Sequence, residues 1–185
     1  MMTSRLDQFD NTTFNKEAGN LKQLCWLALN AVVLKSSWFP FMAPKKQLLK
    51  LFGAQIGTGF VIKPGVSIKF PWKLTIGDHV WLGENCWIDN LDAVYIGDHV
   101  CISQGALLLT GNHDYTQTSF DYRNAPIQLE DGVWVGAKAT VCPGVRCKSH
   151  AVLAVGSVAT KDLEEYMIYQ GNPAQALRKR TIKLS

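Results

Sequence analysis

His113 is the residue best suited to chemistry, and it lies in Gly111-Asn112-His113-Asp114-Tyr115. A neutral imidazole can take up and return a proton because its pKa is close to neutral pH. His113 also begins a segment, 112–126, that interrupts an otherwise regular repeat. Long irregular excursions from a regular array are usually functional, so we expect the loop that His113 enters to belong to a functional site. Asp114 is a candidate to orient the imidazole, although adjacent strand residues point apart.

The repeat consists of branched apolar residues at every sixth position. They are Ile56, Ile62, Ile68, Ile76, Leu82, Ile88, Ile96, Ile102, Leu108, Leu129, Val135, Val141, Cys147, Leu153 and Ala159. A period of six fits neither a helix stripe nor strand alternation. It fits a coil of three short strands and three tight corners, in which each sixth residue points inward and stacks on the next coil. The spacing predicts five coils, at 56–73, 76–95, 96–113, 129–146 and 147–162.

We divide the chain into an N-terminal segment with short helices (1–55), a β-helix (56–162) with a protruding loop (112–126), and a C-terminal tail (163–185). The apolar run 24–34 is shorter than the ~20 residues that span a bilayer. A helix packed on the domain is expected there, with interfacial membrane contact as the alternative. The first twenty residues are polar and lack the features of a signal peptide, so we expect a cytoplasmic protein. Location at the inner face of the membrane is the alternative.

Composition narrows the functional classes. The 185 residues are 47% hydrophobic and 18% charged, which indicates a folded domain, and a net charge of +4 is too small to indicate nucleic-acid binding. Five cysteines without CxxC spacing predict buried thiols rather than a zinc site or disulfides. His79 and His99, in two IGDHV corners, should stack one coil apart and face solvent. A third ligand is not evident, so we expect no metal.

Four stretches of this sequence resemble the hexapeptide-repeat acyltransferases: LLLTGNHDY (107–115), IQLEDGVWVGAKATVCPGV (127–145), AVGSVATKD (154–162) and QGNPAQALRKR (170–180). The similarity is greatest to maltose, galactoside and polysaccharide O-acetyltransferases. The GNHDY and GNPA motifs resemble those of colanic acid biosynthesis acetyltransferases. The resemblance implies a left-handed parallel β-helix that forms homotrimers with active sites between subunits. It also implies acetyl transfer from acetyl-CoA to a sugar hydroxyl, in biosynthesis of a colanic-acid-type exopolysaccharide.

The resemblance also assigns roles to individual residues. His113 is the base, and the amide of Ala137 is the oxyanion donor. Asn85 matches an asparagine that contacts the acceptor sugar, although a plain turn would also explain it. Asp89 and Asn90 are further candidates to hold sugar hydroxyls. Trp134 would line the acceptor groove or the pantetheine groove, although simple packing would also explain it. Contacts to acetyl-CoA fall on Gly136, Ala154, Gly156, Thr160, Lys161 and Arg178.

Two other classes of function stay open on the sequence. One is an acetyltransferase of the same fold that acts on an amino sugar, serine or an antibiotic; serine-directed relatives usually carry a long helical N-terminal domain, for which this chain is too short. The other is a metal-dependent hydratase or a non-catalytic solenoid. A binding solenoid would favour a regular ligand array, whereas this chain carries a histidine-bearing loop and the outward residues Trp72, Trp81 and Trp87. Such exposed tryptophans favour contact with another copy of the chain.

Overall fold

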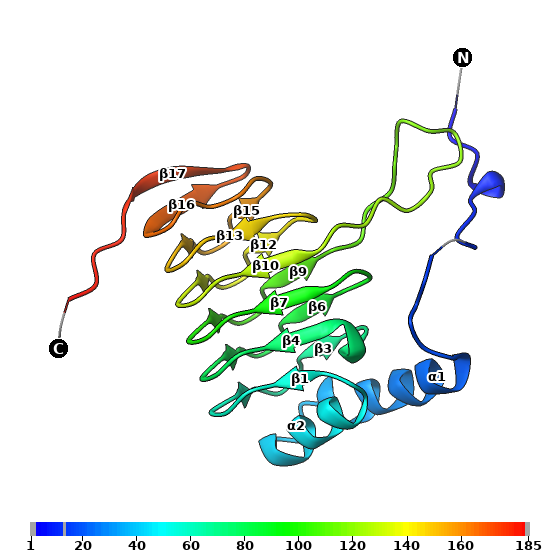
Figure 1. Ribbon diagram of the computed structural model, residues 1–185, viewed down its shortest axis with the longest axis horizontal. Coiled ribbons are helices and arrows are strands. Elements are labelled where there is room, and N and C mark those ends of the chain that lie inside the picture. The colour runs from blue at the N-terminus through cyan, green and yellow to red at the C-terminus, as the bar shows by residue number, and fades with distance from the viewer. Residues whose placement is uncertain (1–2, 13, 184–185) are drawn as a thin grey trace.

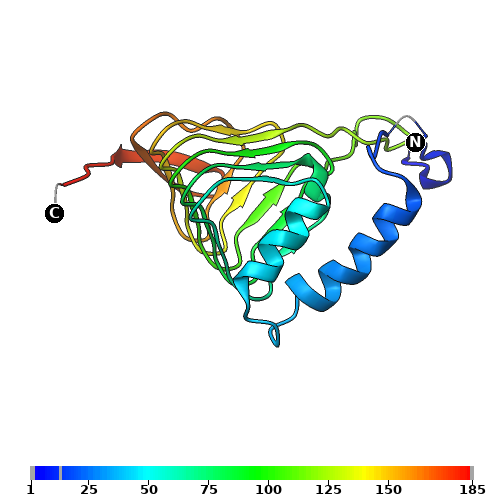
Figure 2. The same ribbon diagram turned by 60° about the horizontal axis from the view of Figure 1, so that its bottom comes forward.

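The computed structural model describes residues 3–12 and 14–183, and short parallel strands wound into a three-sided prism dominate it (Figures 1 and 2). The first side holds β1 (Gln55–Ile56), β4 (Leu74–Ile76), β7 (Val94–Ile96), β10 (Ile127–Leu129) and β13 (Arg146–Cys147). The second holds β2 (Val61–Ile62), β5 (Trp81–Leu82), β8 (Cys101–Ile102), β11 (Trp134–Val135), β14 (Val152–Leu153), β16 (Met167–Gly171) and the antiparallel β17 (Ala174–Lys179). The third holds β3 (Ser67–Ile68), β6 (Trp87–Asp89), β9 (Leu107–Leu109), β12 (Thr140–Val141) and β15 (Val158–Ala159).

The core confirms the six-residue repeat. All fifteen repeat positions are buried, from 0% exposure at Ile62 to 8% at Ile56. Parallel pairing places Ile56 opposite Ile76 and Ile76 opposite Ile96, so equivalent side chains form columns along the axis. The predicted left-handed parallel β-helix is therefore the architecture of this chain.

The solenoid is longer than predicted at its C-terminal end. Five complete coils are present, and β16 begins a sixth turn by pairing in parallel with β14. The chain then reverses into β17, so much of the region predicted as a tail is a β-hairpin. The six-residue spacing is lost after Ala159, which is why the repeat did not reveal it.

Three corners separate the sides. The first corner joins the first side to the second, the second corner joins the second side to the third, and the third corner joins the third side to the first side of the next coil. At the first corner, His79 and His99 adopt positive φ angles of 56° and 57°. Their exposed rings stack with centroids 5.0 Å apart and planes at 11°, as predicted. Among the residues that the structure describes, no group of three or more His, Cys, Asp or Glu is arranged to hold a metal ion.

Short helices close the N-terminal end of the prism (Figure 2). They are α1 (Asn20–Leu29), the π-turn η2 (Asn30–Leu34) and α2 (Met42–Leu51). The short η1 (Leu6–Gln8) lies beside the protruding loop instead, and η3 (Pro71–Lys73) lies in the third corner of the first coil. Trp26 of α1 is 2% exposed and donates its indole N–H to the carbonyl of Ile68 at 2.9 Å. The apolar run is therefore a packed helix, and none of the helices in the described ranges is long and apolar enough to cross a membrane.

Candidate active site

The interrupting loop leaves the third corner between β9 and β10 and projects from the prism (Figure 1). Its two arms pair through an isolated antiparallel bridge between His113 and Tyr122. The amide of Asp114 donates to the carbonyl of Asp121 at 2.8 Å, which holds the arms together. Directly opposed residues in an antiparallel pair project to the same side, so the ring of Tyr122 lies beside the imidazole, 4.9 Å between centroids.

The imidazole of His113 is held in one tautomer. Its Nδ1 lies 2.7 Å from the carbonyl oxygen of Phe120. A carbonyl oxygen can only accept a hydrogen bond, so Nδ1 carries the hydrogen and Nε2 keeps its lone pair. The ring of Phe120 stacks on the imidazole at 4.4 Å and 10°. Asp114 does not orient His113, because its carboxylate accepts hydrogen bonds from Thr116 and Gln117 instead.

An N-terminal segment, residues 5–12 and 14–17, lies along this loop (Figures 1 and 2), and we call it the strap. The amide of Arg5 donates to the carbonyl of Thr118 at 2.7 Å. The amide of Asp10 donates to the carboxylate of Asp121 at 3.0 Å. The ring of Phe9 lies 5.6 Å from the imidazole of His113. The candidate base is thus enclosed partly by residues about a hundred positions away in sequence.

Lys73 fastens the strap to the solenoid. Its ammonium, on a side chain only 7% exposed, donates to the carbonyls of Asn15 at 2.9 Å and Leu91 at 3.0 Å, and it pairs with Glu17 at 3.2 Å. The indole of Trp72 adds a hydrogen bond to the carbonyl of Lys16 at 2.7 Å. Since every recorded contact of Lys73 is structural, we assign it to positioning the strap.

The second corner holds Ala137 and three of the six residues assigned to acetyl-CoA, Gly136, Ala154 and Gly156. The N–H of Ala137 has no acceptor among the residues that the structure describes, while its carbonyl accepts from Gly156 at 2.9 Å. Gly136 is required by close packing, because a Cβ there would lie 2.7 Å from the carbonyl oxygen of Leu153. Ala154 is half-buried and Gly156 exposed, on the same edge one coil on. This edge offers a free backbone donor beside a line of small residues.

The remaining predicted contacts to acetyl-CoA lie elsewhere. Thr160 and Lys161 are exposed at the third corner of the fifth coil, and Arg178 is exposed on β17. Within one chain, one side of the prism, roughly 15–20 Å, separates the second corner from the third, where the loop of His113 begins. A single chain therefore places the base and the amide of Ala137 on different edges.

Three of the residues predicted to contact the acceptor do not converge. Asn85 lies exposed at the second corner with a φ of 57°, as in a plain turn. Asn90 is buried, and its side-chain amide bonds both backbone polar groups of Phe70, at 2.9 and 2.6 Å. Trp134, 46% exposed on the second side, donates its indole N–H to the hydroxyl of Ser103.

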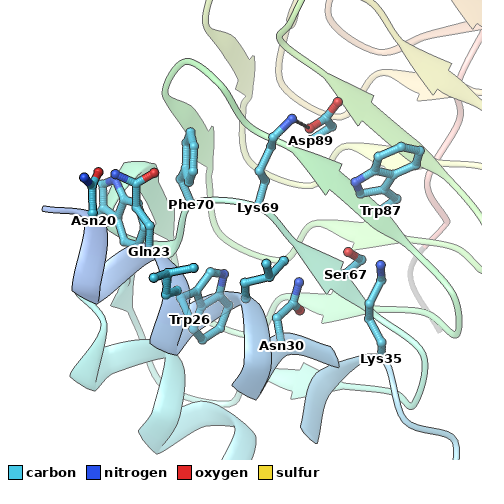
Figure 3. Close-up of a pocket in the computed structure, with 13 residues that line it drawn as sticks. Asn20, Gln23, Trp26, Asn30, Lys35, Ser67, Lys69, Phe70, Trp87 and Asp89 are labelled. Atoms are coloured by element: carbon cyan, nitrogen blue, oxygen red, sulfur yellow. Dashed lines mark ion pairs between the residues drawn. The ribbon is translucent and has the colours of Figure 1, made fainter. Parts of the chain in front are cut away.

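Asp89 lines a groove of about 570 Å³ between α1 and the third side (Figure 3). Its carboxylate pairs with Lys69 at 2.9 Å, and Trp87 and Lys35 also line the groove. The wall contributed by α1 is mostly apolar, with Leu24, Trp26 and Leu27. None of the ring contacts recorded for His113 involves a residue of this groove.

Comparison with known proteins places this geometry in a family. No protein-family model matches the chain. The Escherichia coli K12 protein provisionally named colanic acid biosynthesis acetyltransferase WcaF is 36% identical over 162 residues, covering 86% of this chain and 88% of the relative. The chain belongs to the hexapeptide-repeat acetyltransferases.

Other members of this acetyltransferase family agree with the assignment. The galactoside O-acetyltransferase of Escherichia coli K12 is 27% identical over 138 residues, covering 73% of this chain and 68% of the relative. The crystal structure of the hexapeptide-repeat acetyltransferase VCA0836 from Vibrio cholerae superimposes with a TM-score of 0.78 at 25% identity, covering 88% and 92% of the two chains. The same Vibrio protein has been solved with acetyl coenzyme A and shows the same TM-score.

Sequence reasoning about this acetyltransferase missed the aromatic residues around His113. Phe120 and Tyr122 belong to a loop rich in aromatic side chains, a signal that was present in SFDY (119–122). Phe9 had no comparable signal, because its contact depends on the path of the strap through space. These three rings, together with the carbonyl of Phe120, set the orientation of the imidazole.

Proposed function

We propose that this acetyltransferase moves an acetyl group from acetyl-CoA to a sugar hydroxyl, with His113 as general base. The observation that carries the proposal is the hydrogen bond from Nδ1 of His113 to Phe120, which leaves Nε2 free to accept a proton. The relatives named for colanic acid and galactosides favour a saccharide acceptor. The acetyl-CoA complex of the Vibrio protein favours that donor.

The proposed reaction needs one proton carrier and one oxyanion donor. The acceptor oxygen attacks the thioester carbonyl while Nε2 of His113 takes the hydroxyl proton. The N–H of Ala137 donates to the oxyanion of the tetrahedral intermediate. Collapse breaks the carbon–sulfur bond, and the imidazolium returns its proton to the thiolate of CoA. Acetyl ester and CoA thiol leave together, and the base is regenerated.

The acetyl-CoA groove is proposed along the second corner, at Gly136, Ala154 and Gly156, with Thr160, Lys161 and Arg178 toward the phosphates. Small residues permit close approach of the pantetheine arm, and basic side chains form charge-assisted bonds with phosphate. Trp134 would wall the groove, and Asn85 and Asp89 are the acceptor contacts that the family resemblance implies. Arg180 is not assigned to phosphate binding, because its guanidinium already donates to the carbonyls of Gly132 and His150.

We also propose a homotrimer in which one chain supplies His113 and its neighbour supplies Ala137. Outward residues of the second side favour such an interface: paired strands align Trp81, Cys101 and Trp134 in one column, with the tryptophans 56% and 46% exposed. Trp87 on the third side is 49% exposed. The first side is more polar, since its outward column holds Gln55, Thr75, Gln128 and Arg146 around a single aromatic residue, Tyr95. Exposed apolar patches of this kind mark interaction surfaces.

A colanic-acid-type polysaccharide precursor in the cytoplasm is the setting that we propose, with the inner face of the membrane nearby. Exposed leucines of α1 support membrane contact, since Leu21, Leu24 and Leu27 are at least 64% exposed, although Leu24 and Leu27 also line the groove beside the third side. Residues 18–52 contain five lysines and no acidic residue, and four of these lysines, all except the buried Lys45, can meet an anionic surface. Co-sedimentation with anionic but not neutral vesicles, lost in Leu24→Glu, tests this contact.

The decisive experiment measures CoA thiol release with a saccharide panel and identifies the product by mass spectrometry. His113→Ala should lower the rate by roughly 10²–10⁴, whereas His99→Ala, at an exposed corner, should not. Mixing His113→Ala chains with Ala137→Pro chains, which lack that N–H, should restore activity if the site spans two subunits. Full activity in His113→Ala would refute the base, and no restoration on subunit exchange would refute the shared site.

A further inference from the structure

A polar cavity of about 450 Å³ lies between the strap, the loop and the third corner. The strap contributes Asp10, Asn11, Phe14, Asn15 and Glu17; the corner contributes Lys73, Leu91 and Asp92; the loop contributes Asp121, Tyr122 and Asn124. Its volume is in the range of small-molecule sites. The cavity exists only because the strap closes over the loop.

This cavity adjoins the candidate base through Tyr122. That ring lines the cavity and lies 4.9 Å from the imidazole of His113. Phe14 lies 5.2 Å from Tyr122, so two aromatic rings form one wall. By contrast, the groove between α1 and the third side shares no residue with the ring contacts of His113. A molecule in the polar cavity would therefore contact Tyr122, a direct neighbour of the imidazole, whereas a molecule in the groove would contact none of the rings around His113.

Several polar atoms in the cavity have no partner among the described residues. Asp92 uses Oδ1 to accept from the amide of Ala93 at 2.7 Å, which leaves Oδ2 unbonded. Asn124 uses Oδ1 to accept from the amide of Asn112 at 3.2 Å, which leaves its NH₂ group unbonded. One acceptor and one donor held on fixed backbone, beside aromatic faces, suit the vicinal hydroxyls and apolar face of a sugar ring.

The charges of the cavity define which sugars it can accept. Four carboxylates line it, from Asp10, Glu17, Asp92 and Asp121, against the single ammonium of Lys73, which is engaged by Glu17 and two carbonyls. A carboxylate or phosphate on the ligand would meet like charge at short range, which is costly. A ring with hydroxyls and no charge meets no such penalty.

We propose that this cavity is the acceptor subsite and that it selects an uncharged, hydroxyl-rich glycosyl unit over uronic acids and sugar phosphates. The inference rests on the proposed function and names the class of sugar that receives the acetyl group. Any charged part of a larger acceptor, such as a phosphate linkage, would lie outside the cavity.

The test compares Asp92→Asn with Asp98→Asn. Both changes keep an oxygen that can accept the backbone N–H bonded to Oδ1, and Asp98 lies at the first corner, away from the cavity. Steady-state kinetics would use acetyl-CoA with a neutral methyl glycoside and the corresponding uronate. In the wild type, kcat/KM for the neutral sugar should exceed that for the uronate by at least ten-fold. Asp92→Asn should raise the KM for the neutral sugar about ten-fold and leave the KM for acetyl-CoA unchanged. It should also lower the ratio of kcat/KM for the neutral sugar to kcat/KM for the uronate. Asp98→Asn should change neither the KM for the neutral sugar nor this ratio.

Asn124→Asp, which keeps the accepting oxygen and removes the NH₂ donor, supplies a second variant with the same expectation for the acceptor KM. Wild-type discrimination below two-fold would overturn the charge selection. An unchanged acceptor KM in both cavity variants would overturn the subsite. If the wild type releases CoA with no saccharide tested, the proposed function fails, and that result is distinct from failure of the cavity variants in an active enzyme.

Discussion

Nδ1 of His113 donates a hydrogen bond to the backbone carbonyl of Phe120, 2.7 Å away, while the Phe120 ring stacks on the same imidazole. Phe120 thus controls the tautomer through its backbone and the tilt of the ring through its side chain. Phe120 has a φ of 55°, an uncommon conformation for a bulky residue. Uncommon backbone geometry often accompanies functional positions because the surrounding structure must maintain it.

Replacing the stacked ring should weaken catalysis without affecting donor binding. We expect Phe120→Ala to lower kcat about ten-fold, because a mobile imidazole spends less time aligned with the acceptor hydroxyl. The KM for acetyl-CoA should stay within two-fold, and Phe120→Tyr should retain most activity. Steady-state kinetics with both substrates varied would check this. Equal loss in the Ala and Tyr variants would contradict a role for the stacked ring.

The strap should contribute to activity through Phe9. Its ring touches both the imidazole of His113 and, at 5.2 Å, the ring of Tyr122. We expect Phe9→Ala to lower kcat/KM for the acceptor by about five-fold. Leu6→Ala is the matched control, because Leu6 lies in the same segment but is 68% exposed. If both variants behave alike, the strap acts through general stability rather than through this contact.

Glu130 should make stability depend on pH in acid. Hydrogen bonds from Ser149, and then the neighbouring guanidinium of Arg146, hold the pKa of the Glu130 carboxyl below its usual value. A carboxyl whose pKa is lower in the folded state stabilises the fold above its unfolded pKa, and this contribution is lost as pH falls through the folded pKa. Glu130→Gln should cost about 1 kcal/mol at pH 7, and the difference from wild type should shrink below about pH 4.

Urea unfolding of both proteins at pH 7, 5 and 3.5 would measure that difference. Glu84→Gln, at an exposed position on the second corner, serves as the control. A gap between wild type and Glu130→Gln that stays constant down to pH 3.5 would contradict the assignment.

The five cysteines should react with thiol reagents in the order of their burial. Burial raises the pKa of Cys86 to about 11 and of Cys147 to about 12. Because the thiolate is the reactive form, fewer than about one in a thousand of these thiols is reactive at pH 8, and both side chains are shielded. We expect Cys25, which is exposed on α1, to be labelled first by Ellman's reagent, and Cys86 and Cys147 only after denaturation. Rapid labelling of all five in the native protein would contradict the packed core.

The fold could be predicted because its determinants are local and repeated. A buried apolar residue recurs at every sixth position, and the corners that follow Ile76 and Ile96 share the sequence IGDHV. The position of His113 could be predicted for the same reason, as the place where the period fails. The partners of His113 could not, because Phe9 meets it through a path that no periodicity encodes. The sequence likewise gave no signal that the side-chain amide of Asn90 bonds the backbone of Phe70.

The separation between Asp10 and Asp121, 111 residues apart and joined by one hydrogen bond, has a kinetic consequence. Long-range contacts form late, because closing a large loop lowers the entropy of the chain before any new contact can offset that cost. During refolding, β-sheet signal should therefore return before enzymatic turnover, since the coils mature through neighbouring turns while the two distant segments still have to meet.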